Sequence, residues 1–226
     1  MVEKVETPPE TPGQHLKNKQ RNIRESFNSE FGTRVHRAIS WIIRSENETD
    51  DHDARFIFLW IAFNAAYSAY DEGDANIQER ARLKSFFETL RQCDNDKTIY
   101  EIVWQSFPKQ VRSLLNNQYI YAPFWKHHHG ATGYENWHSR FKSAQTRVNE
   151  ALSEGDTVTL MTHLFDRLYV LRNQIIHGGS TWGSAINRSQ IKDGSELLQI
   201  IVPQIIDLML DNSKADWGSV SYAVVE

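Results

Sequence analysis

The segment Phe56–Tyr70 constrains the fold of this chain more than any other feature. Its sequence, FIFLWIAFNAAYSAY, is apolar nearly all round and contains neither Gly nor Pro. Its length and alanine content favour a helix over a strand, and a helix that is apolar on every side must be covered by protein on every side. The longest apolar run, Phe56–Ala66, includes Asn64 and is too short to span a bilayer. We therefore expect this segment to be the central buried helix of a soluble, cytoplasmic protein without membrane contact.

Apolar residues at helical spacing recur through most of the remaining chain. One stripe at intervals of three and four residues is formed by Val35, Ala38, Ile39, Ile42 and Ile43. Helices are predicted for 14–44, 77–92, 139–152, 157–177 and 193–209, and one or two further helices for 99–115. No strand pattern competes with them and no internal repeat stands out. The sequence therefore predicts an all-α fold.

Several helix ends carry recognisable capping or breaking residues. Asp51 or Asp53 can cap the apolar helix, and Asp156 or Thr157 can cap the helix that Gly178 and Gly179 end. Asp193 with Glu196 resembles a capping box that opens the last helix. Pro108 breaks or opens a helix, and Pro203 predicts a kink. The residues up to Gly13 are rich in Pro, Glu and Thr and are expected to be a disordered lead-in, which leaves 14–226 as a single domain.

The stretch 116–137 differs from the rest of the chain. It contains six aromatic residues, two glycines and the run His127, His128 and His129. We expect a long ordered loop, an insertion held together by its aromatic side chains. Adjacent histidines seldom ligate one ion together and no Cys or acidic ligand flanks them closely, so no metal site is predicted and their role stays open.

Charge and cysteine content narrow the possible functions. The formal net charge of −4 argues against binding nucleic acid through bulk charge, although it allows a nuclease that touches a few phosphates. Cys93 is the only cysteine, which excludes an intrachain disulfide and suits a reducing compartment. We expect Cys93 to have no chemical role.

The candidate catalytic residues lie at the end of a late helix, in the run Arg172-Asn173-Gln174-Ile175-Ile176-His177. Asn173 and His177 are four residues apart and so stack on one helix face, while the long side chain of Arg172 can swing towards the same cleft. Gln174 is expected to point elsewhere. Leu168, Leu171 and Ile175 mark the buried stripe, so the polar trio borders the core.

Arg172, His177 and Asn173 together form a minimal set for cutting RNA. A histidine can take the proton of a 2′-hydroxyl or protonate the leaving 5′-oxygen. An arginine can hold a phosphate and stabilise the charge of the transition state. Asn173 can orient His177 or bind the phosphate. No metal or other cofactor is needed, and two copies of this sparse site meeting in a dimer would supply both an acid and a base.

The segment LYVLRNQIIHGGSTWGSAINRSQIKDGSELLQIIVPQIIDLML, with the earlier FIFLWIAFNAAY, resembles the HEPN superfamily, specifically its Apea-like branch. Arg172, Asn173 and His177 match the motif of that family residue by residue. The resemblance implies a HEPN-like up-and-down helical bundle, here with extra helices and the aromatic insertion, that dimerises with two motifs face to face. It also implies metal-independent endoribonuclease activity, often in a toxin or phage-defence effector, although some relatives only bind.

Other polar residues have both a structural and a functional interpretation. Asn187 and Arg188 either bind phosphate or brace their loop, and Trp182 either stacks on a base or packs against the loop. The basic side chains Arg140, Lys142 and Arg147 form either a phosphate-binding face or, by default, a solvated one. His163 is expected to be structural. With a net charge of −4, positive potential is expected to be concentrated around Arg172, with help from Arg188.

Two classes of function therefore remain. The first is a homodimeric HEPN ribonuclease acting on RNA, with an antitoxin or regulatory protein as a further possible partner. The alternative is a non-catalytic module that binds RNA, a nucleotide or a partner protein through the same cleft.

Overall fold

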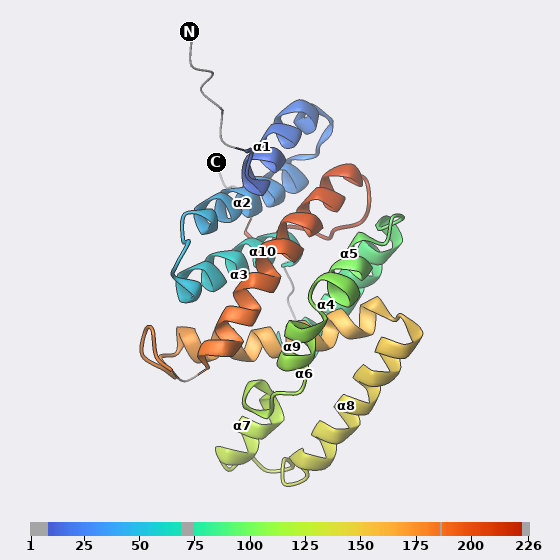
Figure 1. The fold of residues 1–226 in the computed structure, drawn as a ribbon. Coiled ribbons are helices and arrows are strands. Elements are labelled where there is room, and N and C mark those ends of the chain that lie inside the picture. The colour runs from blue at the N-terminus through green and yellow to red at the C-terminus, as the bar shows by residue number, and fades with distance from the viewer. Residues whose placement is uncertain (1–8, 69–74, 186, 223–226) are drawn as a thin grey trace.

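Helix α3 (His52–Tyr67) lies at the centre of a bundle of helices, in contact with α2, α9 and α10 (Figure 1). The computed structural model describes residues 9–68, 75–185 and 187–222, and within these ranges it contains helices and no strand. The all-α prediction is confirmed. The other longer helices are α1 (Pro12–Ile23), α2 (Ser29–Glu46), α4 (Ala75–Cys93), α6 (Pro108–Leu115), α8 (Trp137–Glu154), α9 (Thr157–Ile176) and α10 (Arg188–Asp211). Short helical turns are η1 (Arg24–Ser26), α5 (Thr98–Glu101), η2 (Ile102–Ser106), η3 (Gln118–Ile120) and α7 (Ala122–His128).

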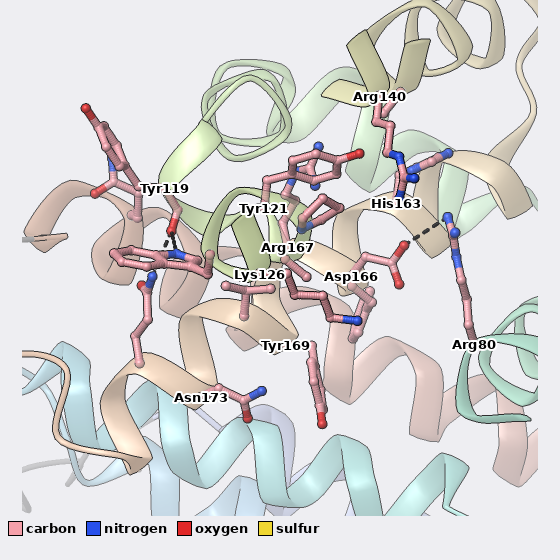
Figure 2. A pocket seen from close by; sticks show the side chains of 18 of the residues that line it. Arg80, Tyr119, Tyr121, Lys126, Arg140, His163, Asp166, Arg167, Tyr169 and Asn173 are labelled. Atoms are coloured by element: carbon pink, nitrogen blue, oxygen red, sulfur yellow. Dashed lines mark hydrogen bonds and ion pairs between the residues drawn. The ribbon is translucent and has the colours of Figure 1, made fainter. Parts of the chain in front are cut away.

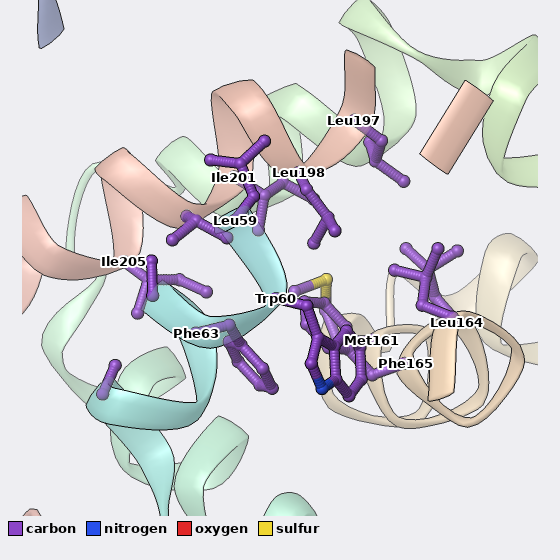
Figure 3. Close-up of a cluster of buried hydrophobic side chains, with 14 of the residues drawn as sticks. Leu59, Trp60, Phe63, Met161, Leu164, Phe165, Leu197, Leu198, Ile201 and Ile205 are labelled. Carbon is purple, nitrogen blue, oxygen red and sulfur yellow. The ribbon is translucent and has the colours of Figure 1, made fainter. Parts of the chain in front are cut away.

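The apolar helix is buried as its sequence predicts. Figure 3 shows Trp60 and Phe63 of α3 beside Phe165 of α9, with leucines and isoleucines of α10 on the other side. The rings of Phe63 and Phe165 have centroids 4.2 Å apart, and both side chains are almost fully buried. Burying an aromatic or branched side chain of this kind contributes about 1.5–3 kcal/mol each to stability. The contacts of α3 with α9 and α10 therefore fix the helix that carries the candidate motif.

Helix α10 passes very close to α3 and α9 at Gly194. A Cβ atom on this buried glycine would lie 2.9 Å from Cε2 of Phe56 and 3.1 Å from Cδ2 of Leu168. Pro203 lies inside α10, as expected, and is buried. The predicted capping box is wrong, because α10 begins at Arg188 and Asp193 is already within it. The helix begins earlier than predicted because Ile191, in its first turn, is already buried in the core.

The N-terminal region differs in detail from the prediction. Helix α1 begins at Pro12, so Pro12 and Gly13 belong to a helix; residues 1–8 of the expected lead-in lie outside the described residues. The backbone N–H of Gly13 donates to Glu46 Oε1 at 2.7 Å, which ties α1 to the end of α2. The region 14–44 is two helices, separated by η1 and a turn in which Asn28 caps α2. Of the two caps predicted for α3, Asp51 is the one used, and it accepts from the N–H of Ala54.

The aromatic stretch is more regular than the expected loop. Residues 122–128 form helix α7, and only 129–136 form an irregular connection to α8. Phe124 of α7 and Trp137 of α8 are buried against each other, with ring centroids 5.0 Å apart at 90°. The prediction of a loop was wrong for residues 122–128. The aromatic side chains of α7 and of the start of α8 form a small core of their own, and the sequence shows no helical spacing of apolar residues that would have predicted it.

Part of the C-terminal segment packs against the helical bundle. The ring centroid of Trp217 lies 5.7 Å from that of Phe86, while Tyr222 stays exposed. The rest of the expected tail packing, at Val224 and Val225, lies outside the described residues. Within the part of the chain that the structure describes, no helix combines the length and the apolar character that crossing a bilayer requires.

Candidate functional site

Helix α9 carries the motif and ends as the sequence predicts. Asp156 caps its first turn by accepting from the N–H of Thr159 at 3.0 Å. The helix ends at Ile176, and Gly178 follows with a positive φ of 68°. The N–H of Gly179 donates to the carbonyl oxygen of Gln174 at 2.7 Å, which closes the helix end. His177 is exposed at this end of α9.

Two of the three motif residues line one large pocket. The pocket has a volume of about 1510 Å³ and is bordered by α3, α4, α7, α8 and α9, with Asn173 and His177 in its wall. Arg172 is not among the lining residues. Its guanidinium instead donates to Oδ1 of Asn173 at 2.9 Å, and its Nε is buried without a hydrogen-bond partner. Asn173 therefore holds the arginine of the motif in this structure.

Gln174 connects three elements instead of pointing away from the site. Its Nε2 donates to the carbonyl oxygen of Tyr119 at 2.7 Å, and its Oε1 accepts from Nδ2 of Asn187 at 2.9 Å. Gln174 also lines the pocket. The expectation that Gln174 lies elsewhere was wrong, because the aromatic segment approaches this face of α9.

The loop residues proposed to bind substrate take different positions. Asn187 lines the pocket and has a positive φ of 58°. Arg188 pairs with Asp53 of α3 at 2.7 Å, and Trp182 donates its indole N–H to Asp51 at 2.9 Å. Neither Arg188 nor Trp182 lines the pocket, although Trp182 is 80% exposed. Both side chains fasten the loop after α9 to the start of α3.

Arginines from three helices line the same pocket (Figure 2). Sequence reasoning grouped only Arg140 and Arg147, with Lys142, and Lys142 is exposed outside the pocket. The arginine cluster consists of Arg80 from α4, Arg140 and Arg147 from α8, and Arg167 from α9. All four lie close enough to the hydroxyl of Tyr121 to interact with it electrostatically. Among the described lining residues, five side chains are Lys or Arg and only Asp166 is acidic. The sequence had suggested that positive charge is concentrated around Arg172 and Arg188. The positive side chains gather instead in the arginine cluster.

Arg167 is the buried member of the arginine cluster. Only 3% of it is exposed, and its guanidinium lies 4.3 Å from the ring centroid of Tyr121 and 5.4 Å from that of Phe141. Its Nε has no hydrogen-bond partner among the described residues. Burial lowers the pKa of Arg167 to about 10, so that it stays charged at neutral pH.

His163 lies beside these arginines. It is buried on α9, one turn before Arg167, and lines the pocket. Burial, together with the nearby charges of Arg80, Arg167 and Arg147, lowers the pKa of His163 from 6.5 to about 4. His163 is therefore neutral at physiological pH and adds a polar group without adding charge.

The three adjacent histidines and Cys93 are the remaining candidates from the sequence. His127 and His128 are on α7, the ring of His128 is 4.2 Å from that of Phe124, and His129 lines the pocket. No group of three or more His, Cys, Asp or Glu side chains suited to hold a metal ion occurs within the described ranges. Cys93 is half-buried, and burial raises the pKa of its thiol.

Two sequence signals pointed towards parts of the arginine cluster. Arg167 interrupts the apolar stripe of α9 between Leu164 and Leu168, and a charged side chain at such a position is rarely buried without a purpose. Arg140 and Arg147 are seven residues apart and so share a helix face. Nothing in the sequence shows that these two faces meet.

Comparison with protein-family models, with curated proteins and with solved structures gave no match. The resemblance to the HEPN superfamily therefore stays a prediction that rests on the two sequence segments that carry it.

Proposed function

We propose that this protein is a metal-independent endoribonuclease of the HEPN type. One observation carries the proposal. Asn173 and His177, with Arg172 bound to Asn173, open onto a pocket whose wall also contains the arginine cluster and several aromatic rings. Phosphates and bases are the two chemical features of RNA that such side chains recognise.

The proposed reaction needs only the groups of the RNA and the protein. The 2′-hydroxyl attacks the neighbouring phosphorus while a histidine takes its proton, and the bond to the 5′-oxygen breaks as that oxygen receives a proton. The products are a 2′,3′-cyclic phosphate and a 5′-hydroxyl. His177 transfers the protons, and Arg172 stabilises the charge that develops on the phosphoryl oxygens.

A single motif supplies one histidine, whereas the reaction uses an acid and a base. We therefore propose that the active protein is a homodimer in which two motifs share one cleft, at which Arg172 turns from Asn173 to the phosphate. We further propose that it acts in the cytoplasm as a toxin or defence effector, held inactive by an antitoxin or regulatory protein. Toxicity on expression that Arg172→Ala relieves would support this role.

The test of catalysis is cleavage of mixed single-stranded RNAs in the presence of EDTA. We expect the wild-type protein to leave 2′,3′-cyclic phosphate ends and His177→Ala to lose this activity. His36→Ala, which changes an exposed histidine on α2 outside the pocket, is the matched control. Equal cleavage by wild type and His177→Ala, or no cleavage by either, would refute the catalytic proposal.

A second candidate is a module that binds RNA or a nucleotide without cutting it. The observation in its favour is that Arg172 does not line the pocket and is already bound to Asn173. RNA binding that persists in wild type without any product, in monomer and dimer alike, would favour this alternative over the ribonuclease.

A further inference from the structure

Among the described residues, the arginine cluster has little compensation for its charge. Arg80 pairs with Asp166 at 3.0 Å, and Arg140 donates to the carbonyl oxygen of Gly133 at 2.8 Å. Arg147 is exposed to solvent, and the buried Nε of Arg167 has no hydrogen-bond partner among the described residues. Like charges held close together destabilise a folded protein unless an anion offsets them. The cluster therefore has the composition of an anion site.

The site is also built in advance of any ligand. Arg167 is buried against the rings of Tyr121 and Phe141, whose centroids are 5.1 Å apart, so its guanidinium has little freedom left to lose on binding. It projects from α9 into the pocket, with Arg80, Arg140 and His163 beside it in Figure 2. A buried, planar and incompletely partnered guanidinium of this kind suits the oxygen atoms of a phosphate.

The arginine cluster and the motif lie at two ends of one pocket. Arg167 precedes His177 by ten residues on α9, which corresponds to about 15 Å along the helix. The pocket wall also contains the aromatic side chains of Tyr169, Tyr119 and Trp125, and the carbonyl oxygen of Tyr119 accepts from both Trp125 and Gln174. Figure 2 shows Tyr119 and Tyr169 on the side of the pocket towards Asn173, away from Arg80 and His163.

We propose that the arginine cluster binds backbone phosphates of a single-stranded RNA, away from the bond that the motif cuts. This inference rests on the proposed ribonuclease function and deepens it. The strand runs along α9, with its phosphates on Arg147, Arg140 and Arg167 and its bases against the aromatic wall. A free nucleotide would fill the arginine end alone and leave the aromatic wall and the motif unused, so the geometry favours a strand.

The first test measures binding of a fluorescent 2′-O-methyl oligouridine, which lacks the attacking hydroxyl and stays intact. We expect Arg147→Gln to weaken binding and to reduce the slope of log affinity against log salt by about 1. The double variant Arg140→Gln/Arg147→Gln should bind at least about tenfold more weakly. Lys142→Gln is the matched control, because Lys142 is an exposed cation on α8 outside the pocket.

The outcomes separate this inference from the catalytic proposal. If wild type cuts RNA but Arg147→Gln and the double variant bind the oligouridine as tightly as Lys142→Gln does, the arginine site is refuted and the catalytic proposal stands. If wild type does not cut RNA but the arginine variants lose binding as expected, the site stands and catalysis is refuted. If inorganic triphosphate competes as strongly as unlabelled oligouridine does, the ligand is a small phosphate compound and the strand is refuted.

Discussion

At the scale of single residues, Gly194 limits how closely α10 approaches the core. The Cβ of an alanine at this position would press against Phe56 and Leu168, both of which are fully buried and cannot move aside. We expect Gly194→Ala to lower the free energy of unfolding by about 1–3 kcal/mol, since overpacking outweighs the gain in helix propensity. Urea unfolding of the purified variant measures this change.

Gly32 on α2 provides the matched control. The nearest atom to a Cβ at Gly32 would be Phe27 Cβ at 3.9 Å, which is ordinary contact. Gly32→Ala should therefore stabilise the protein by up to about 1 kcal/mol. Stabilisation by both substitutions would contradict the tight packing of α10.

The burial of His163 predicts how the free energy of unfolding depends on pH. Its pKa is about 4 in the folded protein, below the ordinary 6.5, because it is buried beside three arginines. The unfolded chain therefore binds a proton in this range that the folded protein does not, and the free energy of unfolding falls as the pH drops from 6.5 towards 4. In His163→Gln this part of the pH dependence should vanish.

The measurement for His163 is a series of urea-unfolding curves across that pH range for wild type and variant. The carboxylates titrate in both proteins, so the difference between the two curves isolates the histidine. A difference that does not change with pH would show that His163 titrates normally.

At the scale of the elements, the stability of α9 depends on its cap. Asp156 accepts from the N–H of Thr159, and this bond satisfies one of the free donors at the start of the helix. Asp156→Ala should lower the free energy of unfolding by about 1 kcal/mol. Asp156→Asn should retain most of the stabilisation that the cap provides, because an asparagine can accept the same hydrogen bond. Thermal and urea unfolding of the two variants test this, and equal losses would show that the charge and not the hydrogen bond matters.

The elements also show where sequence reasoning works and where it fails. The start of α9 at Asp156, its end at Gly178 and the burial of α3 follow from local chemistry and apolar periodicity, and all three were predicted. Helix α7 was missed because its stability comes from ring packing with α8. The prediction placed the start of α10 too late because Asp193 and Glu196 have the spacing of a capping box although both lie inside the helix.

At the scale of the whole molecule, the proposed dimer makes the sharpest prediction. If two motifs share one cleft and the reaction uses both histidines, an excess of His177→Ala should inactivate the wild-type protomers that enter mixed dimers. A mixed dimer keeps only one His177 and so lacks either the acid or the base. RNA cleavage after co-refolding or co-expression of wild type with His177→Ala measures this.

The control for the mixed dimer is His36→Ala, which changes an exposed histidine outside the pocket. The same excess of His36→Ala should leave the wild-type protomers active, and light scattering should give the mass of a dimer. Mixed dimers of wild type and His177→Ala that keep half of the wild-type activity would place each active site within one protomer.

The sequence by itself determined most of the helices, the buried helix α3, and the motif Arg172, Asn173 and His177 at the end of a capped helix. These features depend on neighbours within a few turns, which the spacing of residues reports directly. Only the tertiary structure decided that Arg80, Arg140, Arg147 and Arg167 share a pocket with Asn173 and His177 of the motif. These arginines come from three helices, and which helix faces meet depends on the packing of the whole core, which the spacing of residues within one helix does not encode.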